Sequence, residues 1–482
     1  MSEANGKVML HLSHIAASTG GVVYGDDVAI CGATQDSRKI QAGQLFIALP
    51  GANVDGHDYV AMAAQAGAAA AMVARQVDVD IPQVIVADVE QGLQQAAKAW
   101  RQSLDTKVLA ITGSCGKTTV KQMLAAILSE DGKTLATEGN LNNQLGVPLT
   151  VLGITAKHKY AVIEMGASGA GDIELLCDIA APDVGLITMV AEAHLEGFGS
   201  LQGVAEAKGE IYAGLGHAGI AIVNINEPWG DIWNRQSKAD LMLSFGDNAL
   251  ADVSVSEQHC EGWLQGTEAG SRFKLNLPTT TVDVALPLPG WHNVMNASAA
   301  AAAAVAVSVS AEKIVAGLEL AANVSGRLDI QRLANNAALV DDSYNANPAS
   351  IKAAADWLVS TDIAGQRIMV LGEMAELGEA SLNIHRELGE TLKAKGVDQL
   401  WAVGQNAAKA MAEGFGEQQR HYEHHNLLVT ALAASLSPDD VVLVKGSRSA
   451  AMEQVAQALT AVMAGRGASQ TSPNSGANPH VG

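Results

Sequence analysis

The stretch "LAITGSCGKTTVK" (residues 109–121) decides the fold of this 482-residue chain. It begins with apolar residues, and residues 118–130 then carry apolar side chains at a spacing of three or four. This pattern predicts a buried strand, a glycine-rich turn and an amphipathic helix. Such a turn is the setting of a phosphate-binding loop, because the N–H groups and the dipole at a helix N-terminus attract phosphate.

The glycine spacing of this turn departs from the usual phosphate-loop pattern, which would place a glycine where the chain has Ile111. The alternative interpretation is an ordinary glycine-rich turn with a solvent-facing lysine. The strand before the turn and the helix after it favour the phosphate loop. In that case Lys117 reaches the β- and γ-phosphates, and the hydroxyl of Thr118 ligates Mg²⁺.

The length and composition of the chain limit the classes of protein to consider. A length of 482 residues indicates about three domains, since a domain has roughly 150 residues. The formal net charge of −21 argues against broad nucleic-acid binding, which needs a basic surface. An anionic ligand therefore needs a local site that overcomes the field of the whole protein.

Cysteine usage and hydropathy indicate the compartment. The four cysteines lie far apart and include no C-x-x-C pair, which argues against a zinc cluster or a disulfide framework and fits a reducing compartment. The N-terminus lacks the long apolar segment of a secretory signal. The most apolar stretch, residues 297–311, is short and alanine-rich, which predicts a tightly packed helix. We therefore expect a cytoplasmic protein that is not an integral membrane protein.

Strand-like and helix-like segments alternate along most of the chain, which predicts an α/β protein with parallel sheets. We predict three domains and a tail rich in Ser, Gly, Pro and Asn. The predicted parts are a small N-terminal α/β substrate domain (1–105), a central P-loop parallel-sheet ATPase domain with an antiparallel annex at about 240–289 (106–327), a C-terminal Rossmann-like α/β domain (328–465) and a disordered tail (466–482).

Two further polar residues follow strands that neighbour the phosphate loop. Glu164 ends the apolar run of "AVIEMGASG", and His194 follows the strand "VGLITMV". Alone, each has an ordinary interpretation, as an exposed strand-end glutamate and a solvated histidine. Because parallel strands open toward ligands at their carboxyl ends, the three strand ends together predict an active site.

Other polar residues have structural interpretations that compete with functional ones. Lys208 lies in a predicted helix capped by Ser200 and resembles a solvated surface lysine. Asn293 and Asn296 open an apolar helix, where they either cap it or contact an adenine edge. Asp342 falls in a turn rich in Asp, Asn and Pro, a common structural sequence. The cluster "HYEHH" reads as a solvated loop.

Taken in order, these segments resemble the Mur ligase family, the cytoplasmic ATP-dependent amide-forming enzymes of peptidoglycan synthesis. The phosphate loop of that family reads T-G-x-x-G-K-[ST] and lacks the first glycine, so the departure at Ile111 is a variant of the loop. The residues that the resemblance assigns to this nucleotide loop are Thr112, Gly113, Ser114, Cys115, Gly116, Lys117, Thr118 and Thr119.

The resemblance extends over nearly the whole chain except the C-terminal tail. It rests on "DSRKIQAGQLFIALPG", "DGHDY", "TEGNLNNQLGVPLT", "VIEMGASGAGDI", "AHLEGFGS", "AKGEI", "GWHNVMNA", "SGRLD", "DDSYNANPAS", "LGEMAELGEAS" and "VKGSRSAAME". These segments are most similar to the family member that joins D-Ala-D-Ala to UDP-MurNAc-tripeptide. One departure is "MVAEAHLEG", which places Glu192 where the family more often has an Asn-x-Gly-x-Ala-His pattern.

The resemblance implies ligands for a magnesium ion. Thr118, Glu164 and His194 match the Mg²⁺-associated positions of the family. Lys208 matches the lysine that family members carbamylate with CO₂, which turns a cation into an anion that supports the metal. This replaces the interpretation of Lys208 as a surface lysine.

The resemblance also implies contacts to the nucleotide and to the acyl substrate. Asn293, Arg327 and Asp342 match contacts to the base, the phosphate and the ribose of ATP. Positions that match the UDP end and a substrate-side loop are Ser37, Arg38, Asn140, Asn142 and Asn143.

The implied reaction activates the terminal carboxylate of UDP-MurNAc-tripeptide with the γ-phosphoryl group of ATP, and the amine of D-Ala-D-Ala then displaces phosphate. Both steps bring anions together, so catalysis should rest on positioning and charge neutralisation. The residues expected to act are Lys117, His194, Lys208 and Arg327, in a monomer.

Two other functions remain open at this point. One is a ligase of the same superfamily that adds another amino acid or acts on folate, although the chain has no D-N-P-R segment. The other is a P-loop switch or assembly ATPase, which would hydrolyse nucleotide without any need for a UDP-sugar.

Overall fold

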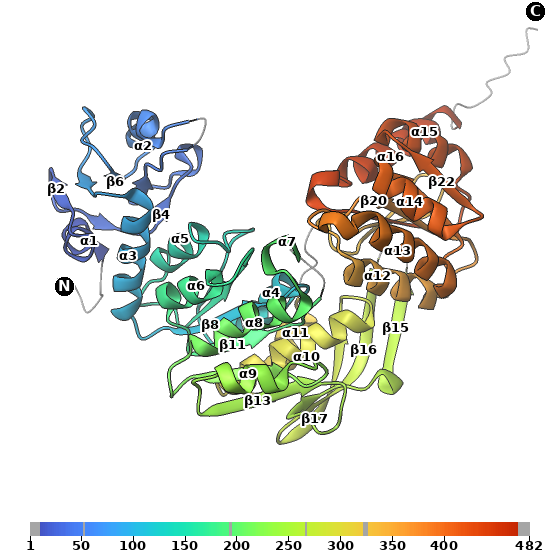
Figure 1. The fold of residues 1–482 in the computed structure, drawn as a ribbon, viewed down its shortest axis with the longest axis horizontal. Coiled ribbons are helices and arrows are strands. Elements are labelled where there is room, and N and C mark those ends of the chain that lie inside the picture. Colours follow the sequence, from blue (N-terminus) through green and yellow to red (C-terminus); the bar gives the residue numbers. More distant parts are fainter. Residues whose placement is uncertain (1–9, 52–53, 192–194, 266–267, 322–325, 471–482) are drawn as a thin grey trace, which may run out of the picture.

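The computed structural model describes residues 10–51, 54–191, 195–265, 268–321 and 326–470. It contains three α/β units that follow one another along the chain. Figure 1 shows the central unit between the N-terminal and the C-terminal unit. Each of the three units is built around a sheet of its own.

The N-terminal unit has a five-stranded sheet in the order β2-β7-β6-β5-β4, beside a small β1-β3 pair. Strands β4 to β7 run parallel, and β2 pairs antiparallel with β7. The strands are β1 (Leu10–His11), β2 (Val22–Tyr24), β3 (Ala29–Ile30), β4 (Ala33–Thr34), β5 (Leu45–Ile47), β6 (Ala70–Val73) and β7 (Gln83–Ile85), and the helices are α1 (Leu12–Thr19), η1 (Ser37–Lys39), η2 (Gly56–Tyr59), α2 (Val60–Gln65) and α3 (Val89–Gln102).

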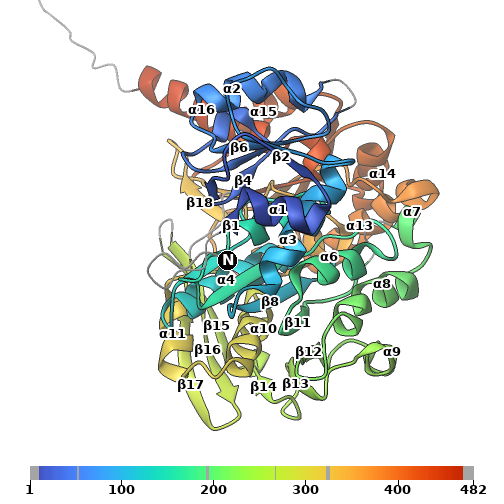
Figure 2. The same cartoon turned by 90° about the vertical axis from the view of Figure 1, so that its left-hand side faces the viewer.

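Helix α3 joins the N-terminal unit to the central one. Asp88 caps its first turn by accepting the N–H of Gln91, and its apolar face packs into a core shared with the central unit. The indole N–H of Trp100 donates to the carbonyl of Ile154 at 2.8 Å, and Arg101 Nε donates to the carbonyl of Ala180 at 2.9 Å. Figure 2 shows α1 and α3 on the side of the N-terminal sheet that faces the central unit.

The central unit has a ten-stranded sheet in the order β15-β16-β14-β13-β12-β11-β8-β10-β9, with β17 beside β16. Its strands are β8 (Lys107–Thr112), β9 (Thr134–Ala136), β10 (Tyr160–Glu164), β11 (Val184–Ile187), β12 (Ile220–Asn224), β13 (Leu241–Gly246), β14 (Val253–Ser254), β15 (Cys260–Gln265), β16 (Glu268–Leu277) and β17 (Thr280–Leu286). Strands β8 to β14 pair in parallel, so the antiparallel annex begins at β15, later than the predicted residue 240.

The helices of the central unit cover both faces of this sheet. They are α4 (Lys117–Ser129), α5 (Gly146–Leu152), α6 (Asp172–Ala180), α7 (Leu195–Phe198), α8 (Leu201–Ala213), α9 (Gly230–Gln236), η3 (Glu257–His259), α10 (Trp291–Ala306) and α11 (Ala311–Glu319). The alanine-rich segment forms most of α10, whose small side chains allow close packing against α4 and the sheet. No helix among the described residues is long and apolar enough to span a membrane.

The C-terminal unit has a six-stranded sheet in the order β18-β19-β23-β20-β21-β22, parallel except for β18. Its strands are β18 (Asp329–Arg332), β19 (Ala338–Asp341), β20 (Arg367–Gly372), β21 (Gln399–Val403), β22 (Gln419–Tyr422) and β23 (Val441–Lys445), and its helices are α12 (Pro348–Ser360), η4 (Gly378–Ala380), α13 (Ser381–Lys395), α14 (Asn406–Phe415), α15 (His425–Ser435), η5 (Arg448–Ala450) and α16 (Glu453–Gln470).

Two segments of the C-terminal unit differ from their predicted form. Helix α16 extends to Gln470, into the segment predicted to be a disordered tail, and residues 471–482 lie outside the described residues. The "HYEHH" cluster is not a loop, because it spans the end of β22 and the start of α15. The ring of His421 also contacts the carbonyl of Gly404 through Nε2 at 3.0 Å.

Candidate nucleotide and ligase site

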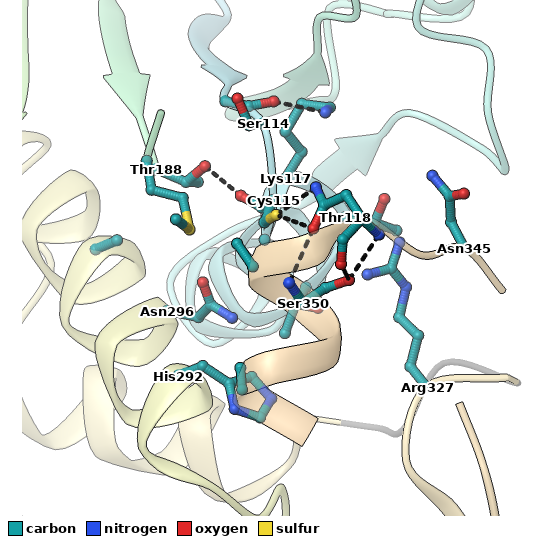
Figure 3. Close-up of a pocket in the computed structure, with 18 of the residues that line it drawn as sticks. Ser114, Cys115, Lys117, Thr118, Thr188, His292, Asn296, Arg327, Asn345 and Ser350 are labelled. Carbon is teal, nitrogen blue, oxygen red and sulfur yellow. Dashed lines mark hydrogen bonds between the residues drawn. The ribbon is translucent and has the colours of Figure 1, made fainter. Parts of the chain in front are cut away.

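A cavity of about 880 Å³ lies between the central and C-terminal units. The phosphate loop and the start of α4 form one wall, and the segment from β19 to α12 forms another. Figure 3 shows Lys117 and Thr118 near Ser350, with Arg327 reaching in beside them. The predicted residues that line this cavity include Lys117, Thr118, Asn140, Asn142, Asn143, Glu164, Lys208, Asn293, Arg327 and Asp342.

The two glycines of the phosphate loop are required by its geometry. Gly113 and Gly116 have φ values of +149° and +82°, which favour glycine. A Cβ on Gly113 would lie 1.9 Å from Oγ1 of Thr188, and one on Gly116 would lie 2.5 Å from Oδ1 of Asn296. Ile111, at the position of the absent first glycine, is buried inside β8. The turn therefore begins later than the usual pattern requires.

Lys117 folds back over the phosphate loop. Its Nζ donates to the carbonyl of Gly113 at 2.6 Å, and burial lowers the pKa of its ammonium, although Glu164 and Cys115 oppose that shift. To bind a phosphate, Lys117 would have to give up its hydrogen bond to the carbonyl of Gly113. Thr118 is buried in the first turn of α4, where its hydroxyl lines the same cavity.

Glu164 ends β10 beside the loop and is buried. Its Oε1 accepts a hydrogen bond from Asn142 Nδ2 at 2.9 Å. Its Oε2 has no hydrogen-bond partner among the described residues, although Nζ of Lys121 lies 3.4 Å away. A carboxylate oxygen with free lone pairs, in one cavity with the Thr118 hydroxyl, is a donor set that suits Mg²⁺.

Lys208 lines this cavity from α8 and is only 3% exposed. Reading it as a solvated surface lysine from its helix alone was wrong, whereas the predicted cap at Ser200 is confirmed by the 3.0 Å bond from the N–H of Gly203. Burial, with the charge of Lys117 next, lowers the pKa of Lys208 to about 7. The side chain is therefore available as an uncharged amine near neutral pH.

His194 and Glu192 lie outside the described residues, so the structure does not place these two side chains. The third strand of the prediction is β11, and the residue that follows it, Thr188, is described. Its Oγ1 donates to the carbonyl of Cys115 and its backbone N–H donates to the carbonyl of Thr112 at 3.0 Å. Thr188 thus fixes the loop, a role that the sequence analysis did not assign.

Arg327 and Asp342 enter the cavity from the C-terminal side. The guanidinium carbon of Arg327 lies 4.5 Å from the centre of the Tyr344 ring, and its buried Nε has no hydrogen-bond partner among the described residues. Asp342 Oδ2 accepts from Lys445 Nζ at 2.7 Å, in a buried ion pair. Lys445 also donates to the carbonyl of Asn345 at 2.9 Å. The sequence analysis missed Lys445, which is the last residue of β23, much later in the chain.

The asparagines at the start of α10 do not cap that helix, whose N-cap residue is Gly290. Asn293 Nδ2 donates to the carbonyl of Pro289 at 2.8 Å, and Asn296 Nδ2 contacts Asn293 Oδ1 at 3.3 Å. Beside them, burial lowers the pKa of His292 to about 4, so this imidazole is neutral near pH 7. All three residues line the cavity, and Asn296 lies against the phosphate loop, because a Cβ on Gly116 would come within 2.5 Å of its Oδ1.

Asn347 crosses from the C-terminal unit to the phosphate loop. It caps α12 by accepting the N–H of Ser350 at 2.8 Å, and its Nδ2 lies 2.9 Å from Sγ of Cys115. Nothing in the sequence indicated this contact of Asn347 with the loop. A pairing between residues so far apart in the chain cannot be read from a single sequence.

The two positions predicted at the UDP end lie in the N-terminal unit and do not line this cavity. Ser37 is buried, with its hydroxyl 3.4 Å from Sδ of Met62. Arg38 is exposed, and its guanidinium forms two hydrogen bonds with Asp36, at 2.8 and 2.9 Å. Their assignment to a sugar nucleotide stays a prediction.

Comparison with known proteins shows the family to which this architecture belongs. Three family models match consecutive parts of the chain: the Mur ligase family catalytic domain (residues 29–106), the Mur ligase middle domain (111–304) and the Mur ligase glutamate ligase domain (326–448). A UDP-N-acetylmuramoyl-tripeptide–D-alanyl-D-alanine ligase of Escherichia coli is 44% identical over 457 residues, which are 94% of this chain and 98% of that protein. The chain belongs to the Mur ligase family.

Other relatives and solved structures agree with this assignment. The ligase of the same description from Bacillus subtilis is 36% identical to this Mur ligase, across 90% of this chain and 94% of that protein. A crystal structure of MurF from Acinetobacter baumannii has a TM-score of 0.84 at 36% identity, covering 94% of this chain and 99% of that one. MurF from Thermotoga maritima, crystallised with ADP, has a TM-score of 0.76 at 27% identity, covering 90% and 98%. The three-domain α/β Mur ligase fold is thereby confirmed.

Proposed function

We propose that this Mur ligase joins D-Ala-D-Ala to UDP-MurNAc-tripeptide at the expense of ATP and releases ADP and phosphate. Relatives named for that reaction match it over nearly their whole length. The observation that carries the proposal is the shared cavity. It is lined by the phosphate loop, Glu164, Lys208 and Arg327, between the central and C-terminal units.

The reaction needs an activated acid, because a carboxylate resists attack by an amine in water. The γ-phosphoryl group passes to an oxygen of the terminal carboxylate, which gives an acyl phosphate and ADP. The amine of D-Ala-D-Ala then attacks the acyl carbon, phosphate leaves with its electron pair, and the amine loses a proton. Lys117 and Arg327, which both line the cavity, would neutralise the phosphate oxygens in both steps.

Thr118 and Glu164 would hold a magnesium ion, with His194 as the further ligand expected from the family. The ion would offset charge on the nucleotide phosphates. Asn142 holds one oxygen of Glu164, so the other keeps a fixed direction. Because Asn142 belongs to the loop with Asn140 and Asn143, this loop connects the metal ligand with the proposed acyl-substrate side of the cavity.

Lys208 would carry a carbamate. An uncharged amine attacks CO₂, forms an N–C bond and loses a proton, and this requires a lysine whose pKa lies near neutrality. Lys208 satisfies the requirement because burial lowers its pKa to about 7. The product is an anion in place of a cation, which would support the magnesium site from the side of α8.

Asn293, Arg327 and Asp342 would contact the base, the phosphates and the ribose of ATP. All three line the cavity that the phosphate loop also lines, which supports this assignment. Ser37 and Arg38 would serve the UDP end of the second substrate, on the N-terminal unit. We further propose that the enzyme works as a cytoplasmic monomer.

The test is ADP release with Mg-ATP in the presence of either or both substrates. Release that requires UDP-MurNAc-tripeptide and D-Ala-D-Ala together is the expected result. A requirement for a single amino acid or for folate would keep the family and refute the substrates. Release at the same rate without any acceptor would instead indicate a nucleotide switch.

A further inference from the structure

A buried lysine lies behind the proposed magnesium ligand. Lys121 is one turn beyond Lys117 in α4, is fully buried and is not among the residues that line the cavity. Its Nζ lies 3.4 Å from Oε2 of Glu164 and 3.4 Å from the carbonyl oxygen of Gly139. The ammonium therefore touches both the metal ligand and the start of the loop that carries Asn142.

Lys121 and Glu164 form an ion pair that is not also a hydrogen bond. Asn142 engages Oε1 of Glu164, whereas Lys121 is the cation that lies within ion-pair distance of Oε2 among the described residues. Two buried charges in contact compensate each other, and removal of one leaves the other without a partner in a medium of low dielectric. Lys121 is thus the counter-ion of Glu164.

The charge of Lys117 also acts on this carboxylate, but the Lys117 ammonium is bonded to the carbonyl of Gly113. The phosphates of a bound nucleotide would attract Lys117, whereas Lys121, which does not line the cavity, would stay paired with Glu164. The oxygen that Lys121 faces is also the one that has no hydrogen-bond partner among the described residues. An ammonium and a divalent cation on one oxygen repel each other strongly at this range.

We propose that Lys121 is a positioning residue that holds Glu164 in place and keeps a divalent cation from binding there until nucleotide phosphates arrive. The negative charge of the phosphates then outweighs the repulsion, so the metal enters with the nucleotide and leaves with it. This inference rests on the magnesium site of the proposed function.

The test measures Mn²⁺ binding to the full chain without nucleotide, from the EPR signal of the free ion. Lys121→Met is expected to bind Mn²⁺ at least tenfold more tightly than the wild type, and Lys121→Arg to resemble the wild type. Lys98→Met is the matched control, because it removes an exposed lysine paired with Asp178 and changes the net charge equally. Equal affinity of wild type and Lys121→Met would overturn the proposal.

A second variant separates this proposal from the magnesium site on which it rests. Glu164→Gln is expected to weaken Mn²⁺ binding in the presence of ADP. If Glu164→Gln binds Mn²⁺ with ADP as the wild type does, the metal site is wrong. If it weakens binding and Lys121→Met gains no affinity, only the role of Lys121 is wrong.

The double variant Lys121→Met/Glu164→Gln covers the case in which the single variant is unstable. Removing both charges leaves no uncompensated partner, so the double variant should have a higher Tm than Lys121→Met in metal-free buffer. Mn²⁺ should raise the Tm of Lys121→Met and leave that of the double variant unchanged. If both variants are destabilised equally, with and without Mn²⁺, Lys121 acts through packing and the proposal fails.

Discussion

Asn347 and Cys115 connect two units of the enzyme at the phosphate loop. The amide Nδ2 of Asn347 lies 2.9 Å from Sγ of Cys115, while Oδ1 of the same side chain caps α12. One residue therefore fixes the start of a C-terminal helix and places that helix start against the nucleotide loop. If the C-terminal unit moves away from the phosphate loop, the contact between Asn347 and Cys115 breaks. The contact therefore reports how the two units are arranged.

Substitution of Asn347 separates its two roles. Asn347→Asp keeps a good N-cap residue but sets a negative charge beside the phosphate loop, so the KM for ATP should rise about tenfold with Tm nearly unchanged. Asn347→Ala loses the cap, worth about 1 kcal/mol, and should lower Tm by a few degrees. Steady-state kinetics and thermal melts check both. An Asn347→Asp enzyme with unchanged KM would show that the side chain does not face the phosphates.

Alanine at the loop glycines should abolish nucleotide binding. In Gly113→Ala the new Cβ would lie 1.9 Å from Oγ1 of Thr188, and the backbone would be strained at a φ of +149°. We expect ADP affinity, measured by calorimetry, to fall at least a hundredfold. Gly216→Ala is the control, because a Cβ there meets nothing within 4 Å and should leave affinity unchanged. Normal ADP binding by Gly113→Ala would exclude the loop as the phosphate site.

Lys208→Met should lower kcat about a hundredfold, since it removes both the amine and the proposed carbamate. With ¹³C-labelled bicarbonate, the wild type should show a carbamate resonance that is missing in Lys208→Met. Lys107→Met, which changes an exposed lysine paired with Asp183, should keep both activity and resonance. A wild-type spectrum without a carbamate signal, in an active enzyme, would refute the modification.

His292 should make the stability of the enzyme depend on pH. Burial lowers its pKa in the folded state to about 4, below the value of 6.5 expected when unfolded. The folded state thus binds fewer protons between these values, so the contribution of His292 is complete above pH 6.5 and is lost as pH falls toward 4. Between pH 7 and pH 5, the Tm of His292→Gln should therefore fall by a few degrees less than the Tm of the wild type. Parallel melting curves for the two proteins would contradict this.

Much of the fold followed from local pattern. The apolar run into Gly113 predicted β8, the phosphate turn and α4, because a parallel strand buried on both faces is a continuous apolar run. The start of the antiparallel annex was placed too early. The stretch "DVSVSEQH" (252–259) alternates in sequence, yet its strand β14 extends the parallel sheet, as β13 does before it. An alternating sequence indicates that one face of a strand is buried. It does not indicate whether the neighbouring strand runs parallel or antiparallel.

The candidate site was predicted less completely than the fold. Residues at strand ends, such as Glu164, could be found because topology brings those ends together. Lys121, Lys445 and Asn347 could not, because their partners lie in other elements and a buried lysine has no distinct local pattern. Lys208 reads as a surface residue in its helix, and only the family resemblance and the fold show that its side chain points inward.

The most direct test of the central claim is the mass of the nucleotide product formed from Mg-ATP, UDP-MurNAc-tripeptide and D-Ala-D-Ala. The account predicts UDP-MurNAc-pentapeptide, with one ADP and one phosphate for each molecule formed. ADP and phosphate formed with unchanged tripeptide, or a product that incorporates a different amine in preference to D-Ala-D-Ala, would contradict it.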